Sequence, residues 1–240
     1  MKETGDGQGT DRFRAWMSHT PARLDVGRAG TRPPTKDMLR FRLDHAAAVD
    51  AVYGEVKPET LDEFGLFSAD TQYRDKEHYL KYPGSGRLLT EESARMLADR
   101  CVSAPQVQIV VSDGLSGRAI DDNLADVLPA LRDALAVNGL AEGTAFFVRG
   151  GRVGVMDDIG RLLKPEALVL LIGERPGLVT AASMSAYMCY RPGPGRRDSD
   201  RMVISNIHPG GTPPVEAGAH IGTLLRKMIE QQASGVKLDV

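Results

Sequence analysis

The feature that most constrains the fold is a series of short, continuously apolar segments in the second half of the chain. Residues 107–112 read VQIVVS and residues 167–172 read ALVLLI, with no regular alternation of polar and apolar side chains. Such segments are typical of parallel strands that are covered by helices on both faces. Helical patterns separate them, so the sequence favours an α/β fold with a mostly parallel, doubly wound (Rossmann-like) sheet. Further strands are predicted at residues 144–148, 184–190 and 202–206, and helices at 121–138, 157–164 and 213–233. Residues 152–155 are expected to extend or pair with the strand at 144–148.

The first part of the chain has a different character. Residues 1–12 are small, polar and charged, which predicts disorder, and residues 20–35 are rich in Pro, Gly and Arg, which predicts an extended arm. Helices are expected from Thr35, as an N-cap, to Gly54 and over residues 90–104, with an irregular segment at 55–88. The predicted organisation is a flexible tail at 1–19, a helical arm or N-terminal part at 20–104 and an α/β domain at 105–240.

The bulk composition excludes several classes of function. A net charge of −2 over 240 residues argues against a general binder of nucleic acid or of membrane surfaces. The longest apolar run is far too short to span a bilayer, and no secretory signal pattern is visible. The five histidines show no pair at metal-ligand spacing, so no metal site is expected. Two widely separated cysteines, Cys101 and Cys189, indicate a reduced, intracellular compartment.

Two glycine-containing turns follow the most apolar strands. SDGLSG at 112–117 and GERPG at 173–177 should both lie at the carboxyl edge of the sheet, where open α/β folds bind ligands. Asp113 either caps its own turn or faces a ligand. Glu174 is either a solvated turn residue or an acceptor for a ligand amide or hydroxyl. The residues alone leave both interpretations open.

Signatures of common enzyme classes are missing from the sequence. Ser116 follows a strand, but GLSG does not match the G-x-S-x-G elbow of serine hydrolases. No Walker A pattern is present, and no G-x-G-x-x-G follows a strand. The segment SNIHPGGTPPVEAG at 205–218 reads as a strand, a loop and a helix that Thr212 caps. A stand-alone α/β enzyme that uses Asp113, Glu174 and His208 as acid–base groups remains an alternative.

Six segments together resemble one family, the light chain (small subunit) of ethanolamine ammonia-lyase. They occur in the family's order from about residue 20 to the end of the chain. The segments are GRAGTRPPT at 27–35, LRFRLDHAAAVDAV at 39–52, VVSDGLS at 110–116, FFVRGGRV at 146–153, LLIGERPGL at 170–178 and ISNIHPGGTPPVEA at 204–217.

The resemblance implies a subunit of an adenosylcobalamin-dependent lyase that converts ethanolamine to acetaldehyde and ammonia. In the family, a β/α-barrel large subunit holds the substrate and performs the radical chemistry that begins with homolysis of the cobalt–carbon bond. The light chain completes the shared cofactor site, so this chain is expected to carry no catalytic residue and to be inactive alone. The implied assembly is a hetero-oligomer in the cytoplasm, and packaging inside a bacterial microcompartment is left open.

The resemblance also maps cofactor contacts onto three residues: Val153, Glu174 and Val203. The family often has Cys where this chain has Val203, so a contact through sulfur would be lost and one through packing would be kept. The arm at 20–35 is interpreted as docking Arg23, Arg28 and Arg32 on carboxylates of the large subunit. The alternative is that the arm is a solvated linker.

Overall fold

The computed structural model describes residues 15–20, 24 and 26–239. The predicted disorder of residues 1–12, most of the tail at 1–19, and Arg23 of the arm lie outside the described residues. None of the helices in the described part of the chain is long and apolar enough to cross a bilayer.

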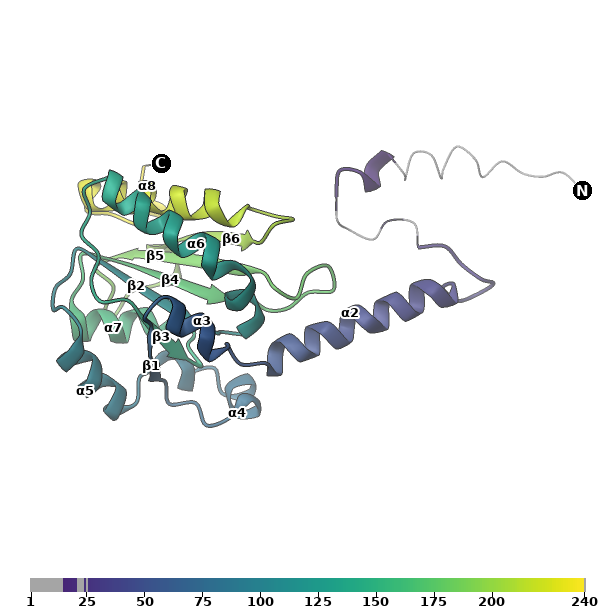
Figure 1. Cartoon of the computed structure of the whole chain (residues 1–240), viewed down its shortest axis with the longest axis horizontal. Coiled ribbons are helices and arrows are strands. Elements are labelled where there is room, and N and C mark those ends of the chain that lie inside the picture. Colours follow the sequence, from purple (N-terminus) through teal and green to yellow (C-terminus); the bar gives the residue numbers. More distant parts are fainter. Residues whose placement is uncertain (1–14, 21–23, 25, 240) are drawn as a thin grey trace, which may run out of the picture.

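One six-stranded sheet organises the fold, in the order β1-β3-β2-β4-β5-β6 (Figure 1). Strands β1, β3, β2 and β4 are mutually parallel, whereas β5 runs antiparallel to both of its neighbours, β4 and β6, so that β6 at the far edge has the same direction as β4. The α/β class with a mostly parallel sheet is therefore confirmed. The strand bounds are β1 Phe67–Asp70, β2 Val107–Ser112, β3 Phe146–Arg149, β4 Ala167–Gly173, β5 Met184–Tyr190 and β6 Arg201–Ile207.

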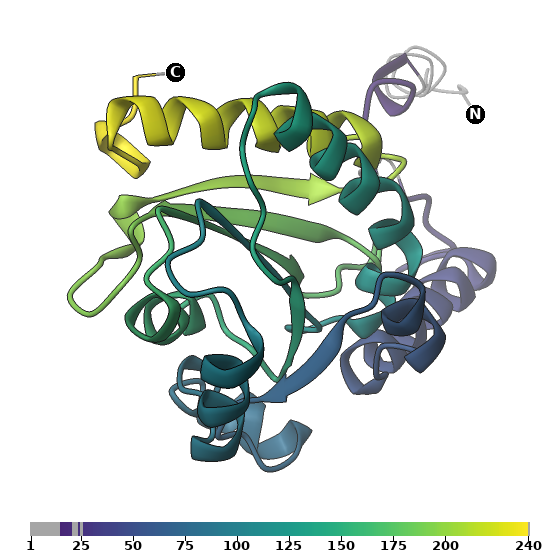
Figure 2. The same cartoon turned by 60° about the vertical axis from the view of Figure 1, so that its left-hand side comes forward.

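Helices cover both faces of this sheet, as its continuously apolar strands require. In Figure 2, α6 (Gly117–Val137) and α8 (Pro214–Gln231) lie together on one face. On the other face lie α5 (Glu91–Arg100) and α7 (Val155–Leu163). Alternate residues of each central strand enter opposite cores. In β4, for example, Val169 belongs to the α6–α8 core and Leu170 belongs to the α7 core.

The N-terminal part is built around one long helix that leaves the sheet domain. Figure 1 shows α2 (Thr35–Tyr53) projecting from the domain, and only its residue Ala51 is buried, although all nineteen of its residues are described. Two short helices, α3 (Pro58–Glu63) and α4 (Lys76–Lys81), follow. The prediction of an irregular segment at 55–88 was wrong, because this segment also supplies β1. The four-residue strand, FSAD, is too short to show a strand period in the sequence. The boundary at residue 104 stays a prediction, although β1 pairs with β3 of the sheet.

Several predicted helix ends also need correction. Helix α6 begins at Gly117 rather than near 121, because the side chain of Ser116 accepts a hydrogen bond from the backbone N–H of Ala119. Thr35 is not a cap, because Pro34 precedes the first turn of α2 and no side chain caps it. Helix α5 ends at Arg100, four residues earlier than predicted.

Two expectations about connecting segments were also wrong. Residues 152–155 form no strand; they turn directly into α7, which starts at Val155. Thr212 does not cap α8. Its hydroxyl donates to the backbone oxygen of Ser205, at 3.3 Å, and so closes the loop after β6.

Helices α6 and α8 approach each other closely at two glycines of α8. A Cβ on Gly218 would lie 2.5 Å from the carbonyl oxygen of Val127, and one on Gly222 would lie 2.5 Å from the Cβ of Ala134. Real Cβ atoms essentially never sit that close to backbone oxygen. The two helices can therefore bury Ile221 and Leu225 against α6 only while these positions lack side chains.

We expect Gly218→Ala to lower the free energy of unfolding by about 1–3 kcal/mol, because the added methyl group forces α8 away from α6. Helix propensity alone predicts the opposite sign, a gain of about 0.5–1 kcal/mol. Urea unfolding followed by circular dichroism measures the difference. Ala219→Gly, at the next and exposed position of α8, is the control for propensity. A more stable Gly218→Ala protein would contradict the close-packing argument.

Candidate functional site

The turns that follow three parallel strands are bonded to one another at the carboxyl edge of the sheet. The Asp113 carboxylate, after β2, accepts a hydrogen bond of 2.8 Å from the backbone N–H of Gly150, after β3. The backbone N–H of Leu115 donates to the carbonyl of Gly173, at the end of β4, at 3.0 Å. The prediction that the SDGLSG and GERPG turns meet at one edge is thus confirmed.

Asp113 has a structural position within this edge. Its side chain is only 8% exposed, and its nearest cation is Lys76, whose Nζ lies 4.0 Å from Oδ2. Burial raises the pKa of Asp113, and the nearby Lys76 charge and the Gly150 N–H only partly offset that rise. Burial likewise lowers the pKa of Lys76. The carboxylate therefore links the turn after β2 to the turn after β3. It has a structural role, as the capping interpretation predicted, but the N–H that it binds belongs to the neighbouring turn rather than to its own.

Ser116 caps helix α6 and connects it to the loop after β4. Its hydroxyl donates to the backbone oxygen of Ala181 at 2.8 Å and accepts from Ala119 N at 3.2 Å. The side chain is fully buried and both of its hydrogen-bonding roles are in use. This geometry agrees with the missing serine-hydrolase elbow, because the Ser116 hydroxyl is not free to act as a nucleophile.

Val153 and Glu174 line one small cavity at the sheet edge. The cavity has a volume of about 90 Å³ and also includes Arg152, Arg175 and Tyr187. Glu174 is half-buried, and its backbone N–H is fixed by a 2.9 Å bond to the oxygen of Ser183. The carboxylate thus leaves the sheet at a fixed point while its side chain stays accessible.

Val153 and Val203 line a second, larger cavity beside the first. Its volume is about 720 Å³, and Tyr187 contributes to both cavities. Tyr187 lies on β5 opposite Val203 of β6, whose side chain is 48% exposed. Burial, then the charge of Glu174, raises the pKa of the Tyr187 hydroxyl. Each of the three residues that the sequence singled out therefore lines a cavity that includes Tyr187, although Glu174 and Val203 line different cavities.

Arg152 forms part of the wall that both cavities share. Its guanidinium stacks 3.9 Å from the centre of the Tyr79 ring and donates to the Tyr79 backbone oxygen at 3.1 Å. The Tyr79 hydroxyl in turn donates to the carbonyl of Gly151 at 2.7 Å. Burial raises the pKa of Tyr79, so this phenol remains a neutral donor. Sequence reasoning missed both residues, since they lie 73 residues apart in the chain.

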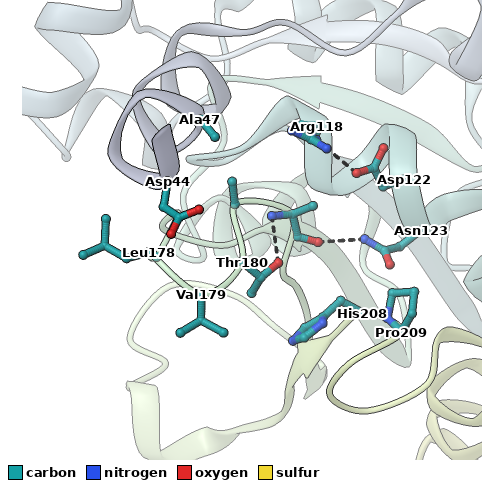
Figure 3. Close-up of a pocket in the computed structure, with 13 residues that line it drawn as sticks. Asp44, Ala47, Arg118, Asp122, Asn123, Leu178, Val179, Thr180, His208 and Pro209 are labelled. Carbon is teal, nitrogen blue, oxygen red and sulfur yellow. Dashed lines mark hydrogen bonds and ion pairs between the residues drawn. The ribbon is translucent and has the colours of Figure 1, made fainter. Parts of the chain in front are cut away.

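His208 belongs to a different part of the surface. Figure 3 shows its side chain in a cavity of about 510 Å³ between α2, α6 and the loops after β4 and β6, with Asp44 and Arg118 also on the walls. Its Nδ1 accepts from the N–H of Gly210 at 3.1 Å, so Nε2 carries the proton that it donates to Asn206 Oδ1 at 2.9 Å. The His208 ring is therefore held in place by hydrogen bonds to two residues close to it in the chain, Asn206 and Gly210.

The acid–base constellation of the stand-alone enzyme is therefore not assembled. Glu174 and His208 line separate cavities, and the Asp113 carboxylate is occupied by Gly150 and Lys76. Among the described residues, no group of three or more His, Cys, Asp or Glu side chains could hold a metal ion. The edge offers cavity walls with donors and acceptors, and no nucleophile beside a base.

Comparison with known proteins identifies the family of this chain. The family model described as "Ethanolamine ammonia-lyase light chain (EutC)" matches residues 10–239. The chain belongs to the ethanolamine ammonia-lyase light chain family. It is accordingly a subunit of a carbon–nitrogen lyase that acts in ethanolamine degradation, as its sequence motifs implied.

Curated relatives agree along nearly the whole chain. The ethanolamine ammonia-lyase small subunit of Lachnoclostridium phytofermentans is 47% identical over 92% of this chain and 75% of its own length. The small subunit of Fusobacterium nucleatum is 46% identical over 95% of this chain and 77% of its own. That of Clostridioides difficile is 48% identical over 91% and 75%.

The buried position of Asp113 predicts an unusual pH dependence of stability. Because its pKa is raised in the folded state, its contribution is fully present below the unfolded pKa of about 3.9 and is lost as pH rises through the folded value. Asp113→Asn keeps an acceptor for Gly150 and removes the titration. We therefore expect the wild type to gain stability relative to Asp113→Asn as pH falls from 7 toward 4.

Urea unfolding of both proteins at several pH values measures this difference. Asp126→Asn, at an exposed position of α6, is the matched control. A difference that is independent of pH, or one that favours the Asn variant at low pH, would contradict the assigned burial of Asp113.

Proposed function

We propose that this chain forms one wall of an adenosylcobalamin site that the large subunit of ethanolamine ammonia-lyase completes. The observation that carries the proposal is that Val153 and Glu174 line one cavity with Tyr187, while Val153 and Val203 line an adjoining cavity that also includes Tyr187. Tyr187 and Val203 lie level with the middle of β4, and Glu174 directly follows β4 at the carboxyl edge of the sheet. This edge is where open α/β folds bind their ligands. The family resemblance maps cofactor contacts onto the same three residues.

The residues present fit the chemistry of a corrinoid. Its corrin ring is a broad apolar surface with amide side chains at its rim, which need apolar contacts and hydrogen-bond partners. Val153 and Val203 offer exposed or half-buried apolar surface beside a cavity of about 720 Å³. Glu174 offers an acceptor for an amide N–H or a hydroxyl. Val203 can pack where relatives often have Cys, so the departure from the family pattern is compatible with a packing contact.

This chain would bind and orient the cofactor rather than react with substrate. Bound adenosylcobalamin supplies the cobalt–carbon homolysis that starts radical conversion of ethanolamine to acetaldehyde and ammonia. The chain's own contribution is a rigid wall: its turns are fastened by Asp113 and Gly173, and Arg152 is stacked on Tyr79. Rigid walls reduce the entropy lost on binding and exclude water from the covered face. Substrate binding and the radical steps belong to the large subunit.

A second surface, on helix α2, supports the proposal that this chain binds a partner subunit. Helix α2 carries several exposed apolar side chains, among them Leu39 at 57% and Leu43 at 70% exposure. An isolated amphipathic helix gains little in water, so such a face is expected to dock on another protein. Arg28 and Arg32 of the preceding arm are exposed, which suits docking on carboxylates of the large subunit.

The expected compartment is the cytoplasm. Both cysteines, Cys101 and Cys189, are buried and free. Free thiols persist where the environment is reducing.

Glu174→Ala should weaken adenosylcobalamin binding to the assembled two-subunit complex by about 1–3 kcal/mol, because an amide N–H or hydroxyl of the cofactor loses the carboxylate that accepts its hydrogen bond. Glu174→Gln, which keeps an acceptor oxygen, should lose less. Equilibrium dialysis with absorbance detection gives the dissociation constant. Glu216→Ala, at an exposed acid of α8, is the control. An unchanged dissociation constant in Glu174→Ala would remove Glu174 from the cofactor site.

Leu43→Asp should weaken association with the large subunit by about tenfold or more, since it places a charge where an apolar side chain is buried on docking. Sedimentation of mixed subunits over a concentration series measures the change. Val137→Asp introduces the same charge at an 86% exposed position at the end of α6 and should assemble normally. Equal assembly of both variants would show that α2 lies outside the subunit interface.

A further inference from the structure

Residues 72–88, which include α4, leave the sheet after β1 and return to the same place. The two ends of this segment are joined by a backbone hydrogen bond of 2.9 Å, from the N–H of Gln72 to the oxygen of Leu88. Directly outside that bond, Thr71 and Leu89 form an antiparallel bridge. We call residues 72–88 the α4 loop, which Figure 1 shows at the outer margin of the domain. Because its base is closed, this loop can move without disturbing the sheet.

The α4 loop has hydrogen bonds of its own and little buried surface. The side chain of Asp75 caps α4, and Ser85 bonds to the oxygen of Tyr82 through both its N–H and its hydroxyl. All of residues 72–88 are described, and only Tyr79 and Gly86 among them are buried. A compact surface loop with internal bonds and few buried residues is the kind of unit that opens locally at a small cost in free energy.

The two buried residues hold the α4 loop against the turn after β3. Tyr79 packs on the guanidinium of Arg152, and its hydroxyl donates to the carbonyl of Gly151. The oxygen of Gly86 accepts the backbone N–H of Arg152 at 2.7 Å. A Cβ on Gly86 would lie 2.6 Å from the oxygen of Gly150 and 2.8 Å from the side chain of Arg152. The loop therefore lies directly on this turn, with no room for a side chain at Gly86.

Two partly exposed side chains of the α4 loop add weaker contacts. Nζ of Lys76 lies 3.4 Å from the oxygen of Gly114 and 4.0 Å from the carboxylate of Asp113. The ring of Tyr73 covers Gly150, where an added Cβ would meet it. These contacts gather at the turns after β2 and β3, so release at a few points would free the loop from the edge of the sheet.

The α4 loop lines both cavities of the candidate site. Tyr79 borders the smaller cavity together with Glu174. Pro83 and Arg87 border the larger cavity together with Val203. Outward movement of the loop would therefore widen both cavities at once, while the hydrogen bonds that join the turns after β2, β3 and β4 stay intact. A lid that controls access to a site has this arrangement of a joined base and a mobile cover.

We propose that the α4 loop is a lid over the cofactor face of this chain, and that Tyr79 is the positioning residue that latches it through Arg152 and Gly151. The inference rests on the proposed function: the lid opens for adenosylcobalamin to enter or leave, and bound adenosylcobalamin holds it closed. The closed state has few contacts, so changes at the latch raise the population of the open state.

Two glycines of the α4 loop provide a matched pair of variants. In Gly86→Ala the added methyl group meets the oxygen of Gly150 and pushes the lid off the sheet edge, whereas among the described residues Gly84 has no neighbouring group within 4 Å of an added Cβ. Hydrogen–deuterium exchange is followed in the assembled two-subunit complex without corrinoid. Gly86→Ala should speed exchange in residues 73–88 about 5- to 100-fold, the effect of a typical overpacking strain, and leave β4 and α6 unchanged. Gly84→Ala should match the wild type.

Tyr79→Phe is a milder second variant, because it keeps the ring and removes only the hydrogen bond to Gly151. Exchange in the loop should rise about two- to tenfold, the effect of one hydrogen bond. Tyr82→Phe removes a hydroxyl from a 61% exposed tyrosine of the same loop and is the control.

Binding kinetics distinguish a lid from a wall that only adds contact area. Stopped-flow absorbance gives the association and dissociation rate constants of adenosylcobalamin for the same complexes. A lid predicts that Gly86→Ala raises both rate constants and changes the dissociation constant less than about twofold, because opening limits entry and release alike. A wall predicts faster dissociation with unchanged association. Adenosylcobalamin should also slow exchange of the α4 loop in the wild-type complex.

Each outcome decides the proposal. Faster exchange confined to the α4 loop in Gly86→Ala, with faster entry and release of adenosylcobalamin, supports the lid. Equal exchange in the Gly86→Ala and Gly84→Ala complexes overturns it, as does faster dissociation with unchanged association. Faster exchange throughout the sheet shows that Gly86 only supports the fold, and also overturns it. If the wild-type complex binds no adenosylcobalamin, the proposed function fails, and the exchange comparison without corrinoid distinguishes that failure from a loop that does not open.

Discussion

The constraint on which the rest of the structure depends is the bonding of the turns at the carboxyl edge of the sheet. A buried carboxylate, Asp113, holds the turn after β2 to the N–H of Gly150 after β3. Gly114, with a φ of +52°, lies so close to Gly173 and Ile172 that no side chain fits, and this joins the same turn to the end of β4. Three strand ends thus become one rigid rim, and Glu174 and Val153 keep fixed positions on it.

That rigidity explains how a chain without a catalytic constellation can serve a reaction. A wall that is ordered before binding loses little entropy when a large ligand packs on it. Tyr187, Val153 and Arg152 are common to two cavities of this wall, of which the smaller also includes Glu174 and the larger also includes Val203. Helix α2 projects from the domain, but its residues Asp44 and Ala47 line a cavity together with residues 177–182 of the loop after β4, so the proposed docking surface adjoins the rim.

Much of the fold could be predicted because its central strands are covered on both faces. VQIVVS and ALVLLI are continuously apolar, and their strands were placed within one residue of the observed ends. The short edge strand β1 could not be predicted, because four residues, FSAD, that are partly exposed carry no periodic signal. The start of α6 was predicted four residues too late, because a glycine opens it and only the contacts of Ser116 show the cap. The sequence pattern thus predicted the elements that burial determines, but it did not predict the boundaries that side-chain contacts determine.

By itself the sequence determined the α/β class, the family, and the placement of two glycine-rich turns at one edge of the sheet. These follow from local apolar patterns and from motifs that are contiguous in the chain. Only the tertiary structure decided that Asp113 is a buried link, that His208 faces a different cavity from Glu174, and that arginines from positions 87 to 201 gather beside Val153 and Val203. The physical reason is that charge and hydrogen bonding depend on which segments meet in space, and segments far apart in the chain meet only after the sheet has formed.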